Sequence, residues 1–244
     1  MGGSFRRPPS AGELADMQHL VDQAMREGAL GMSTGLIYLP GVFARTDELV
    51  ALSKTVSGHG GLYVSHMRSE GTNIFRAVDE VFTIATQARL PVHISHLKLA
   101  GRPMWGKHNE LLARLDRARA GGIRLTHDQY AYTASSTSLR QLLPDDMVVG
   151  GSAEFSKRMS DPKTHEKTIS WMKGRIRARQ REDYSYAVIA LHKKDPRYNG
   201  LNVVQAAKLR FGQETLDHQI ELIIEIERSE ERRVGKECRS RWSP

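Results

Sequence analysis

The chain has 244 residues, of which 39% are hydrophobic and 26% are charged, and its net charge at pH 7 is +8. This length can bury the core of one large domain or of two smaller ones. No apolar run is long enough to span a membrane, and no signal-peptide core follows Met1. No basic cluster is interleaved with aromatic residues, as a nucleic-acid surface would usually require. We therefore expect a globular protein without a membrane or nucleic-acid partner.

The first half of the chain alternates between helix and strand patterns. A capping box formed by Ser10 and Glu13 opens the first helix. The predicted elements are a helix at residues 11–27, a strand at 29–36, a helix at 46–57, a strand at 61–68, a helix at 72–89 and a strand at 90–98. A helix that connects two such strands makes them parallel and brings their carboxyl ends to one side of the sheet.

The second half of the chain begins with one more helix and strand and then loses its regular pattern. The loop at residues 100–106 is long for a strand-to-helix connection, which favours a functional loop. Helices are predicted at 110–120, 153–159, 163–179, 202–210 and 214–227, and strands at 123–132 and 186–191. The predicted fold class is therefore α/β.

The last segment of the chain, residues 228–244, has no helical or strand period and no apolar face. It resembles a translated adapter or vector tail, so we predict that it is not native and assign residues 1–227 to the folded domain. The only cysteine, Cys238, lies in this tail and receives no role. A chain without other cysteines is typical of a reducing compartment, and we expect a cytoplasmic location.

Two of the predicted strands end in a Ser-His pair, at Ser65-His66 and Ser95-His96. If these strands are parallel, His66 and His96 lie side by side at the carboxyl end of the sheet, where α/β proteins place their chemistry. Two imidazoles that converge there suit a divalent metal ion, and the alternative is that both are hydrogen-bonded core residues. His93 is out of phase with His96, so we expect it to face the helix layer.

Several polar residues are predicted to lie near this pair of histidines. Lys98 has the same strand parity as His96 and can hold a substrate carboxylate, or it can be a surface lysine. Tyr38 and Tyr130 can hydrogen-bond a ligand, or pack with their hydroxyls in water. Since Gly-x-Gly-x-x-Gly, Walker, Cys-x-x-Cys and Gly-x-Ser-x-Gly strings do not occur, nucleotide, redox and serine-hydrolase functions lack their motifs.

Two further residues are expected to support such a site. Asp128 would share one face of the strand at 123–132 with Tyr130 and Tyr132, because side chains in a strand alternate with a period of two. Arg68 can support a ligand carboxylate or pair with Glu70 or Asp128. We favour the structural pairing.

Five strings of the sequence, in this order, resemble one known family over residues 5–227. They are GALGMSTGLIYLP at residues 28–40, YVSHMRSE at 63–70, ISHLK at 94–98, WG at 105–106 and DQYAY at 128–132. The family is the N-acyl-D-amino-acid deacylases, or D-aminoacylases, of the metal-dependent amidohydrolase superfamily. Taken together, the strings are far more specific than any one of them alone.

The resemblance implies a fold, a cofactor and a set of site residues. The family fold is a (β/α)8 TIM barrel with a small β-domain, so this chain would be a partial barrel of about strands four to seven with their helices. His66 and His96 would be zinc ligands, and Tyr38, Lys98 and Tyr130 would bind the N-acyl-D-amino acid substrate. Zinc would activate the water that cleaves the amide bond, releasing a carboxylate and a D-amino acid, and an aspartate of the last barrel strand would move the protons.

The sequence also departs from the family pattern. The family opens with a His-x-His and adds a bridging metal ligand, whereas none of the ten histidines here forms a His-x-His. The catalytic aspartate is expected after residue 227, where the tail stands. We therefore expect the chain by itself to be inactive and the activity to belong to its full-length parent. The alternatives are another cyclic-amide amidohydrolase, such as a hydantoinase or dihydroorotase relative, and a non-catalytic binding module on the same fold.

Overall fold

The computed structural model describes residues 6–229 and 240–242. The chain divides into two compact units, Met1–Ala131 and Tyr132–Pro244. All the candidate site residues that were predicted from the sequence, His66, His96, Lys98, Tyr38, Tyr130, Arg68 and Asp128, lie in the first unit.

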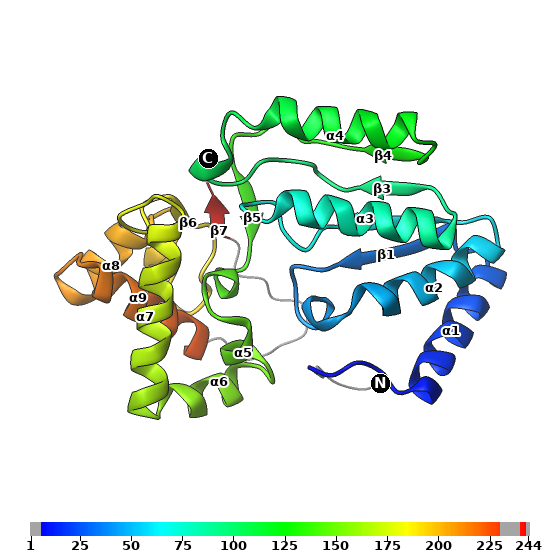
Figure 1. The fold of residues 1–244 in the computed structure, drawn as a ribbon. Helices are drawn as coiled ribbons and strands as arrows, with labels where there is room; N and C mark the ends of the chain where they lie inside the picture. Colours follow the sequence, from blue (N-terminus) through cyan, green and yellow to red (C-terminus); the bar gives the residue numbers. More distant parts are fainter. Residues whose placement is uncertain (1–5, 230–239, 243–244) are drawn as a thin grey trace. The chain divides into compact units, whose positions relative to one another are not determined.

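The first unit contains a four-stranded parallel sheet (Figure 1). Its strands, adjacent in the order β1-β2-β3-β4, are β1 (Gly31–Gly35), β2 (Leu62–His66), β3 (Val92–Ile94) and β4 (Leu125–His127). A Cβ atom on Gly31 would lie 2.1 Å from the carbonyl oxygen of Leu62, so the close approach of β1 and β2 requires glycine there. The structure confirms the predicted α/β class with parallel strands.

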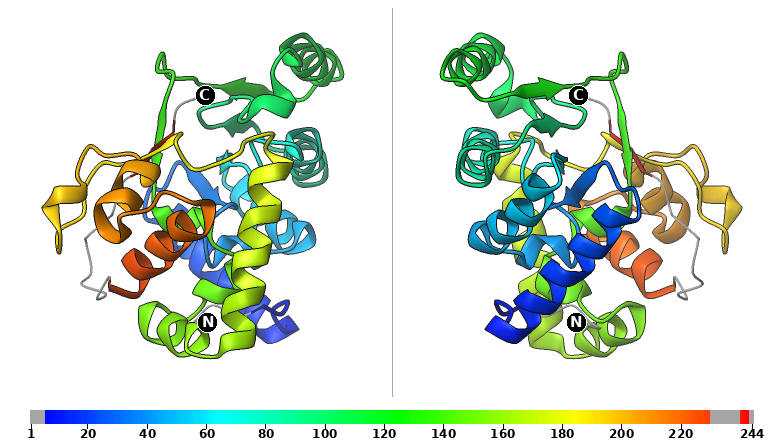
Figure 2. Two further views of the ribbon diagram at one scale, coloured as in Figure 1. Left: turned by 90° about the vertical axis from the view of Figure 1, so that its left-hand side faces the viewer. Right: turned by 90° about the vertical axis from the view of Figure 1, so that its right-hand side faces the viewer.

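Three helices connect these strands and cover one face of the sheet (Figures 1 and 2). They are α2 (Thr46–Gly58), α3 (Ile74–Ala88) and α4 (His108–Ala120), with short 3-10 turns η1 (Gly41–Phe43) and η2 (Arg102–Met104). A further helix, α1 (Ala11–Arg26), precedes β1 and packs against α2. The predicted capping box is present at the start of α1, where Ser10 and Glu13 satisfy each other's backbone N–H groups.

The core of the first unit lies between the sheet and these helices. Tyr63, Val92 and Ile94 are fully buried in it and pack with apolar residues of α2 and α3. His93 alternates with Val92 and Ile94 along β3, so its side chain lies on the opposite face and its Nδ1 contacts Thr126 Oγ1 at 2.8 Å. The expectation that His93 faces the helix layer was therefore wrong.

Strand β4 is much shorter than the predicted strand at residues 123–132. Strand β4 pairs with β3, and the last pair is His127 with Ile94, where β3 ends. The residues after His127 therefore have no β3 residue to pair with. Asp128 instead bonds through its N–H to Ile94 O and through its carbonyl to the N–H of Leu97. Residues 128–132 therefore do not share a strand face, and Tyr132, which is 79% exposed, lies in the second unit.

The second unit combines helices with a small antiparallel sheet in the strand order β5-β7-β6. Its elements are β5 (Ser135–Thr137), η3 (Leu139–Leu142), α5 (Asp145–Val148), α6 (Ser152–Met159), α7 (Pro162–Ala178), β6 (Ala187–Ile189), η4 (Pro196–Tyr198), α8 (Val203–Phe211), α9 (Leu216–Ser229) and β7 (Ser240–Trp242). The four longer helices and β6 match predicted segments, whereas β5 and α5 were not predicted.

The predicted tail at residues 228–244 is described only in part. Its first two residues end α9, residues 240–242 form β7, and Cys238 lies outside the described residues. The division into a domain at 1–227 and a non-native tail therefore stays a prediction. Among the helices that the structure describes, none is long and apolar enough to cross a membrane.

Candidate metal site

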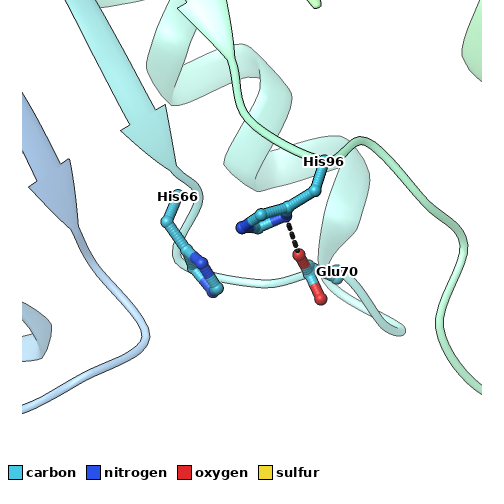
Figure 3. Close-up of side chains that lie close together, drawn as sticks. All are labelled: His66, Glu70 and His96. Carbon is cyan, nitrogen blue, oxygen red and sulfur yellow. Dashed lines mark ion pairs between the residues drawn. The ribbon is translucent and has the colours of Figure 1, made fainter. Parts of the chain in front are cut away.

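His66 and His96 come together at the carboxyl ends of β2 and β3. Their ring centroids lie 4.4 Å apart, with the rings nearly perpendicular (Figure 3). His66 is the last residue of β2, whereas His96 reaches the site through a turn beyond β3 in which its φ is +40°. Asp128 holds this turn, because its carboxylate accepts a hydrogen bond from the backbone N–H of His96. Asp128 therefore contacts the backbone of His96 from outside β4, and its supporting role stays a prediction.

Glu70 is a third member of the group and is not among the site residues predicted from the sequence. Its Oε1 lies 2.9 Å from Nδ1 of His96 and accepts from Nζ of Lys98 (Figure 3). One potential ligand atom from each of His66, Glu70 and His96 falls within 4.8 Å of the others. The available signal was the position of Glu70 in the YVSHMRSE string, four residues after His66.

The electrostatics of the group favour forms that bind cations. Burial disfavours the imidazolium of His66 and lowers its pKa to about 4, although the negative charge of Glu70 opposes this shift. Burial also raises the pKa of Glu70, but the hydrogen bond from His96 and the charge of Lys98 outweigh it and leave the pKa below its ordinary value. At neutral pH the group therefore offers a neutral imidazole and a carboxylate, which are the protonation states of metal ligands.

The donor set fits a divalent metal ion. Nε2 of His66 is buried and finds no hydrogen-bond partner among the described residues. A buried imidazole nitrogen in this state is costly unless it has a ligand. Nitrogen donors from two histidines with a nearby carboxylate oxygen suit a first-row divalent metal. Within residues 6–229 and 240–242, no second group of three or more histidine, cysteine or carboxylate side chains lies as close together.

The three residues predicted to bind substrate lie around the two histidines. The ring of Tyr38 is 4.8 Å from that of His66, and the ring of Tyr130 is 6.4 Å from that of His96. Nζ of Lys98 lies 2.8 Å from the carbonyl oxygen of His96 and 5.2 Å from the ring centroid of Tyr130. Lys98 reaches this place through the turn after β3 and not through strand parity. The roles of these residues stay predictions.

Arg68 pairs with neither Glu70 nor Asp128, the two partners expected from the sequence. Its guanidinium forms two hydrogen bonds of 3.0 Å with the carboxylate of Glu80 on α3. It also donates to the carbonyl oxygens of Val42 and Ala44, at 2.9 and 2.8 Å. Arg68 therefore ties α3 to the segment that follows β1, through partners other than the two predicted ones.

Replacing Arg68 by alanine is expected to lower the free energy of unfolding by about 2–3 kcal/mol, below the usual loss for a fully buried pair because Arg68 is part-exposed. The loss arises because Glu80, whose side chain is only 10% exposed, would keep a charge without its partner. Arg114→Ala is the matched control, since Arg114 makes the same paired contact with the neighbouring carboxylate of Asp79 on α3, but at a more exposed place. Urea unfolding should show a loss below about 1 kcal/mol for this control, and equal losses would contradict the assignment.

The depressed pKa of His66 predicts a pH dependence of stability in the metal-free chain. The group is neutral in the folded state down to about pH 4, but in the unfolded state it takes up a proton below its ordinary pKa of 6.5. The contribution of neutral His66 to the free energy of unfolding is therefore complete above pH 6.5 and is lost as pH falls from 6.5 towards 4. Urea titrations should show that the free energy of unfolding falls less between pH 7 and pH 5 for His66→Gln than for the unchanged chain. Identical slopes would contradict the burial of a neutral His66.

Comparisons with known proteins agree with the resemblance found in the sequence. No family model matches the chain. It is 40% identical over 137 residues to a D-aminoacylase of Alcaligenes xylosoxydans xylosoxydans, a match that covers 56% of this chain and 28% of that protein. It is also 40% identical over 131 residues to an N-acyl-D-glutamate deacylase of the same organism, covering 54% and 27%. The chain thus spans less than a third of the length of these curated relatives.

Solved structures give the same result for the fold. A D-aminoacylase variant in complex with copper chloride superposes with a TM-score of 0.70 at 27% identity, covering all of this chain and 40% of that one. The N-acyl-D-glutamate deacylase of Bordetella bronchiseptica, complexed with zinc and a phosphonate inhibitor that mimics the tetrahedral intermediate, superposes with a TM-score of 0.69 at 23% identity, covering 98% and 40%. The resemblance to the D-aminoacylases is therefore confirmed.

Proposed function

We propose that the full-length protein carrying this chain is a zinc-dependent hydrolase that removes the acyl group from N-acyl-D-amino acids. The observation that carries the proposal is the convergence of His66, His96 and Glu70 at the ends of two adjacent parallel strands. Its support from outside the chain is the 40% identity to a D-aminoacylase over 137 residues. Because the match covers only 28% of that relative, the activity is proposed for the whole protein.

The first unit is proposed to be part of a (β/α)8 barrel. Strands β1 to β4 would be strands four to seven, so that His66 and His96 follow the fifth and sixth strands. The support is a parallel sheet in chain order with connecting helices on one face, together with the TM-score of 0.70 to a D-aminoacylase variant.

Each residue of the site has a separate proposed role. A zinc ion held by His66 and His96 would polarise the amide carbonyl and lower the pKa of a bound water. Lys98 would bind the carboxylate of the substrate, since its ammonium group lies beside the two histidines, where Nζ contacts Glu70 and both the carbonyl and Nδ1 of His96. Tyr38 and Tyr130 stand beside the two histidines, where they would position the acyl group.

Asp128 is proposed to support the site and not to move the proton. Its carboxylate is already engaged by the backbone N–H of His96 and lies 3.4 Å from Nε2 of His93. The hydrogen bond from His96 lowers the pKa of Asp128, and a carboxyl group with a depressed pKa is a weak base at neutral pH. The general base remains unassigned among the residues of this chain.

The test is an assay of the full-length protein, loaded with zinc, on N-acetyl-D-methionine and its L enantiomer. We expect hydrolysis of the D substrate, little hydrolysis of the L substrate, and loss of activity after His66→Ala or after removal of the metal with a chelator. A preference for hydantoin or dihydroorotate would favour the cyclic-amide alternative. Binding of N-acetyl-D-methionine without turnover by the zinc-loaded protein would favour a non-catalytic module, and either result would overturn the proposal.

A further inference from the structure

Glu70 connects two residues that the proposed function uses separately. It lies in the loop between β2 and α3, and its side chain is 16% exposed. Its Oε1 meets both Nδ1 of His96 and Nζ of Lys98, which approach from the segment after β3. The two segments are also joined by a 2.7 Å hydrogen bond from the backbone N–H of Ala100 to the carbonyl of Glu70. The backbone of Glu70 is therefore tied to the segment that carries His96 and Lys98.

The contacts among these three groups favour one tautomer of His96. A lysine ammonium only donates hydrogen bonds, and an ionised carboxylate only accepts them. Nδ1 of a neutral His96 lies 2.9 Å from Oε1 of Glu70 and 3.0 Å from Nζ of Lys98, so it can either donate to the carboxylate or accept from the ammonium. We assign the first arrangement, because the contact with Glu70 is the shorter one and Lys98 already donates to Glu70 and to the carbonyl of His96. The 3.0 Å contact between Nδ1 and Nζ of Lys98 then joins two donors and is not a hydrogen bond. Nε2 of His96 is left with its lone pair.

This lone pair lies on the side of the ring where a metal ion would bind. Figure 3 shows the ring of His96 between Glu70 and His66, with the nitrogen that does not contact Glu70 turned towards the His66 side. A histidine that ligates a metal commonly donates its other ring N–H to a carboxylate, which fixes the ring and its tautomer. Glu70 occupies that second position.

We propose that Glu70 is a positioning residue that holds His96 as the Nδ1–H tautomer and, through the same oxygen, anchors the ammonium of Lys98. The part that concerns metal and substrate rests on the proposed function, whereas the tautomer does not. One carboxylate thus sets both the nitrogen offered to the metal and the place of the cation offered to the substrate carboxylate. Loss of Glu70 disturbs both at once.

Two substitutions separate the two effects. Glu70→Gln keeps a carbonyl oxygen that accepts from Nδ1–H but removes the charge that attracts Lys98, whereas Glu70→Ala removes both. The matched control is Glu80→Gln, because Glu80 is another poorly exposed carboxylate in an ion pair, with Arg68, and is not a member of the metal group. Circular dichroism of all four proteins confirms that the folded fraction is equal before they are compared.

The first measurement reports the tautomer in the metal-free chain. Long-range ¹H–¹⁵N spectra of the ¹⁵N-histidine-labelled chain are recorded at pH 8, where histidine is ordinarily neutral. The His96 signals are identified by their absence in His96→Gln. We expect protonation at Nδ1 in the unchanged chain, in Glu70→Gln and in Glu80→Gln, and a shift to Nε2 in Glu70→Ala. Protonation at Nε2 in the unchanged chain, or no change in Glu70→Ala, would overturn the proposal.

The second measurement is zinc affinity, determined by competition with a chromophoric chelator. Glu70→Ala should bind zinc roughly 10- to 100-fold more weakly, the usual effect of losing a carboxylate behind a histidine ligand. Glu70→Gln should lose much less zinc affinity, and Glu80→Gln should bind zinc as tightly as the unchanged chain. Equal losses of zinc affinity in Glu70→Ala and Glu70→Gln would show that the Glu70 carboxylate binds the metal directly, and this would overturn its positioning role. Absence of zinc binding by the unchanged chain would count against the proposed function, while the tautomer would still decide the role of Glu70.

Discussion

Replacing His96 by alanine is expected to weaken zinc binding on the order of 100-fold or more, since loss of an outer-shell partner alone costs up to that factor. His96 supplies one of two imidazoles that lie 4.4 Å apart, and zinc sites commonly need three protein ligands. In the full-length protein the same substitution should abolish hydrolysis of N-acyl-D-amino acids, because metal-activated water would be lost with the metal.

His93→Ala is the matched control for this experiment. His93 lies three residues before His96, on β3, and its imidazole contacts Thr126 and Asp128 instead of the metal group. Zinc affinity is measured for both variants by competition with a chromophoric chelator. We expect His93→Ala to stay within a few-fold of the unchanged chain. Equal losses for the two variants would mean that the metal site has been placed wrongly.

Lys98→Met is expected to lower kcat/KM for N-acetyl-D-methionine by roughly 10- to 150-fold in the full-length protein, which corresponds to about 1.5–3 kcal/mol for a hydrogen bond to a charged group. Methionine keeps a long unbranched side chain but cannot pair with a carboxylate. The loss should appear mainly in KM, because the substrate carboxylate carries the same charge before and during the reaction.

The substrate provides the control for Lys98. N-acetyl-D-methionine amide carries the same acyl group and side chain but no carboxylate, so the unchanged protein should hydrolyse it less efficiently. Lys98→Met should affect this amide much less than the acid. If both substrates lose the same factor, Lys98 acts on the reacting amide or on the structure and not on the substrate carboxylate.

Much of the first unit could be predicted from the sequence because its signals are local. The Ser10–Glu13 capping box and the helical period of α3 lie within single segments, and the structure shows both elements within two residues of the predicted bounds. Parallel pairing followed from the connecting helices, and with it the expectation that His66 and His96 lie side by side. No distant contact was needed for these inferences.

The remaining features depend on contacts between distant residues or on a turn that no pattern reveals. The pairing of Arg68 with Glu80 joins a loop to a helix, and Glu70 meets Lys98 across 28 positions of sequence. Because the chain turns at His96 with a positive φ, parity along β3 did not describe the residues after Ile94. The same turn ends β3 at Ile94, so β4 can pair with β3 only as far as His127. The predicted strand at 123–132 was therefore too long.

The central claim is that His66 and His96 together hold a metal ion, and X-ray absorption at the zinc edge tests it most directly. The chain is loaded with one equivalent of zinc and compared with His66→Ala and His96→Ala. The account predicts scattering from two imidazoles with Zn–N distances of about 2.0–2.1 Å in the unchanged chain. Each variant should lose one imidazole. A spectrum without imidazole scattering, or one that neither substitution changes, would contradict it.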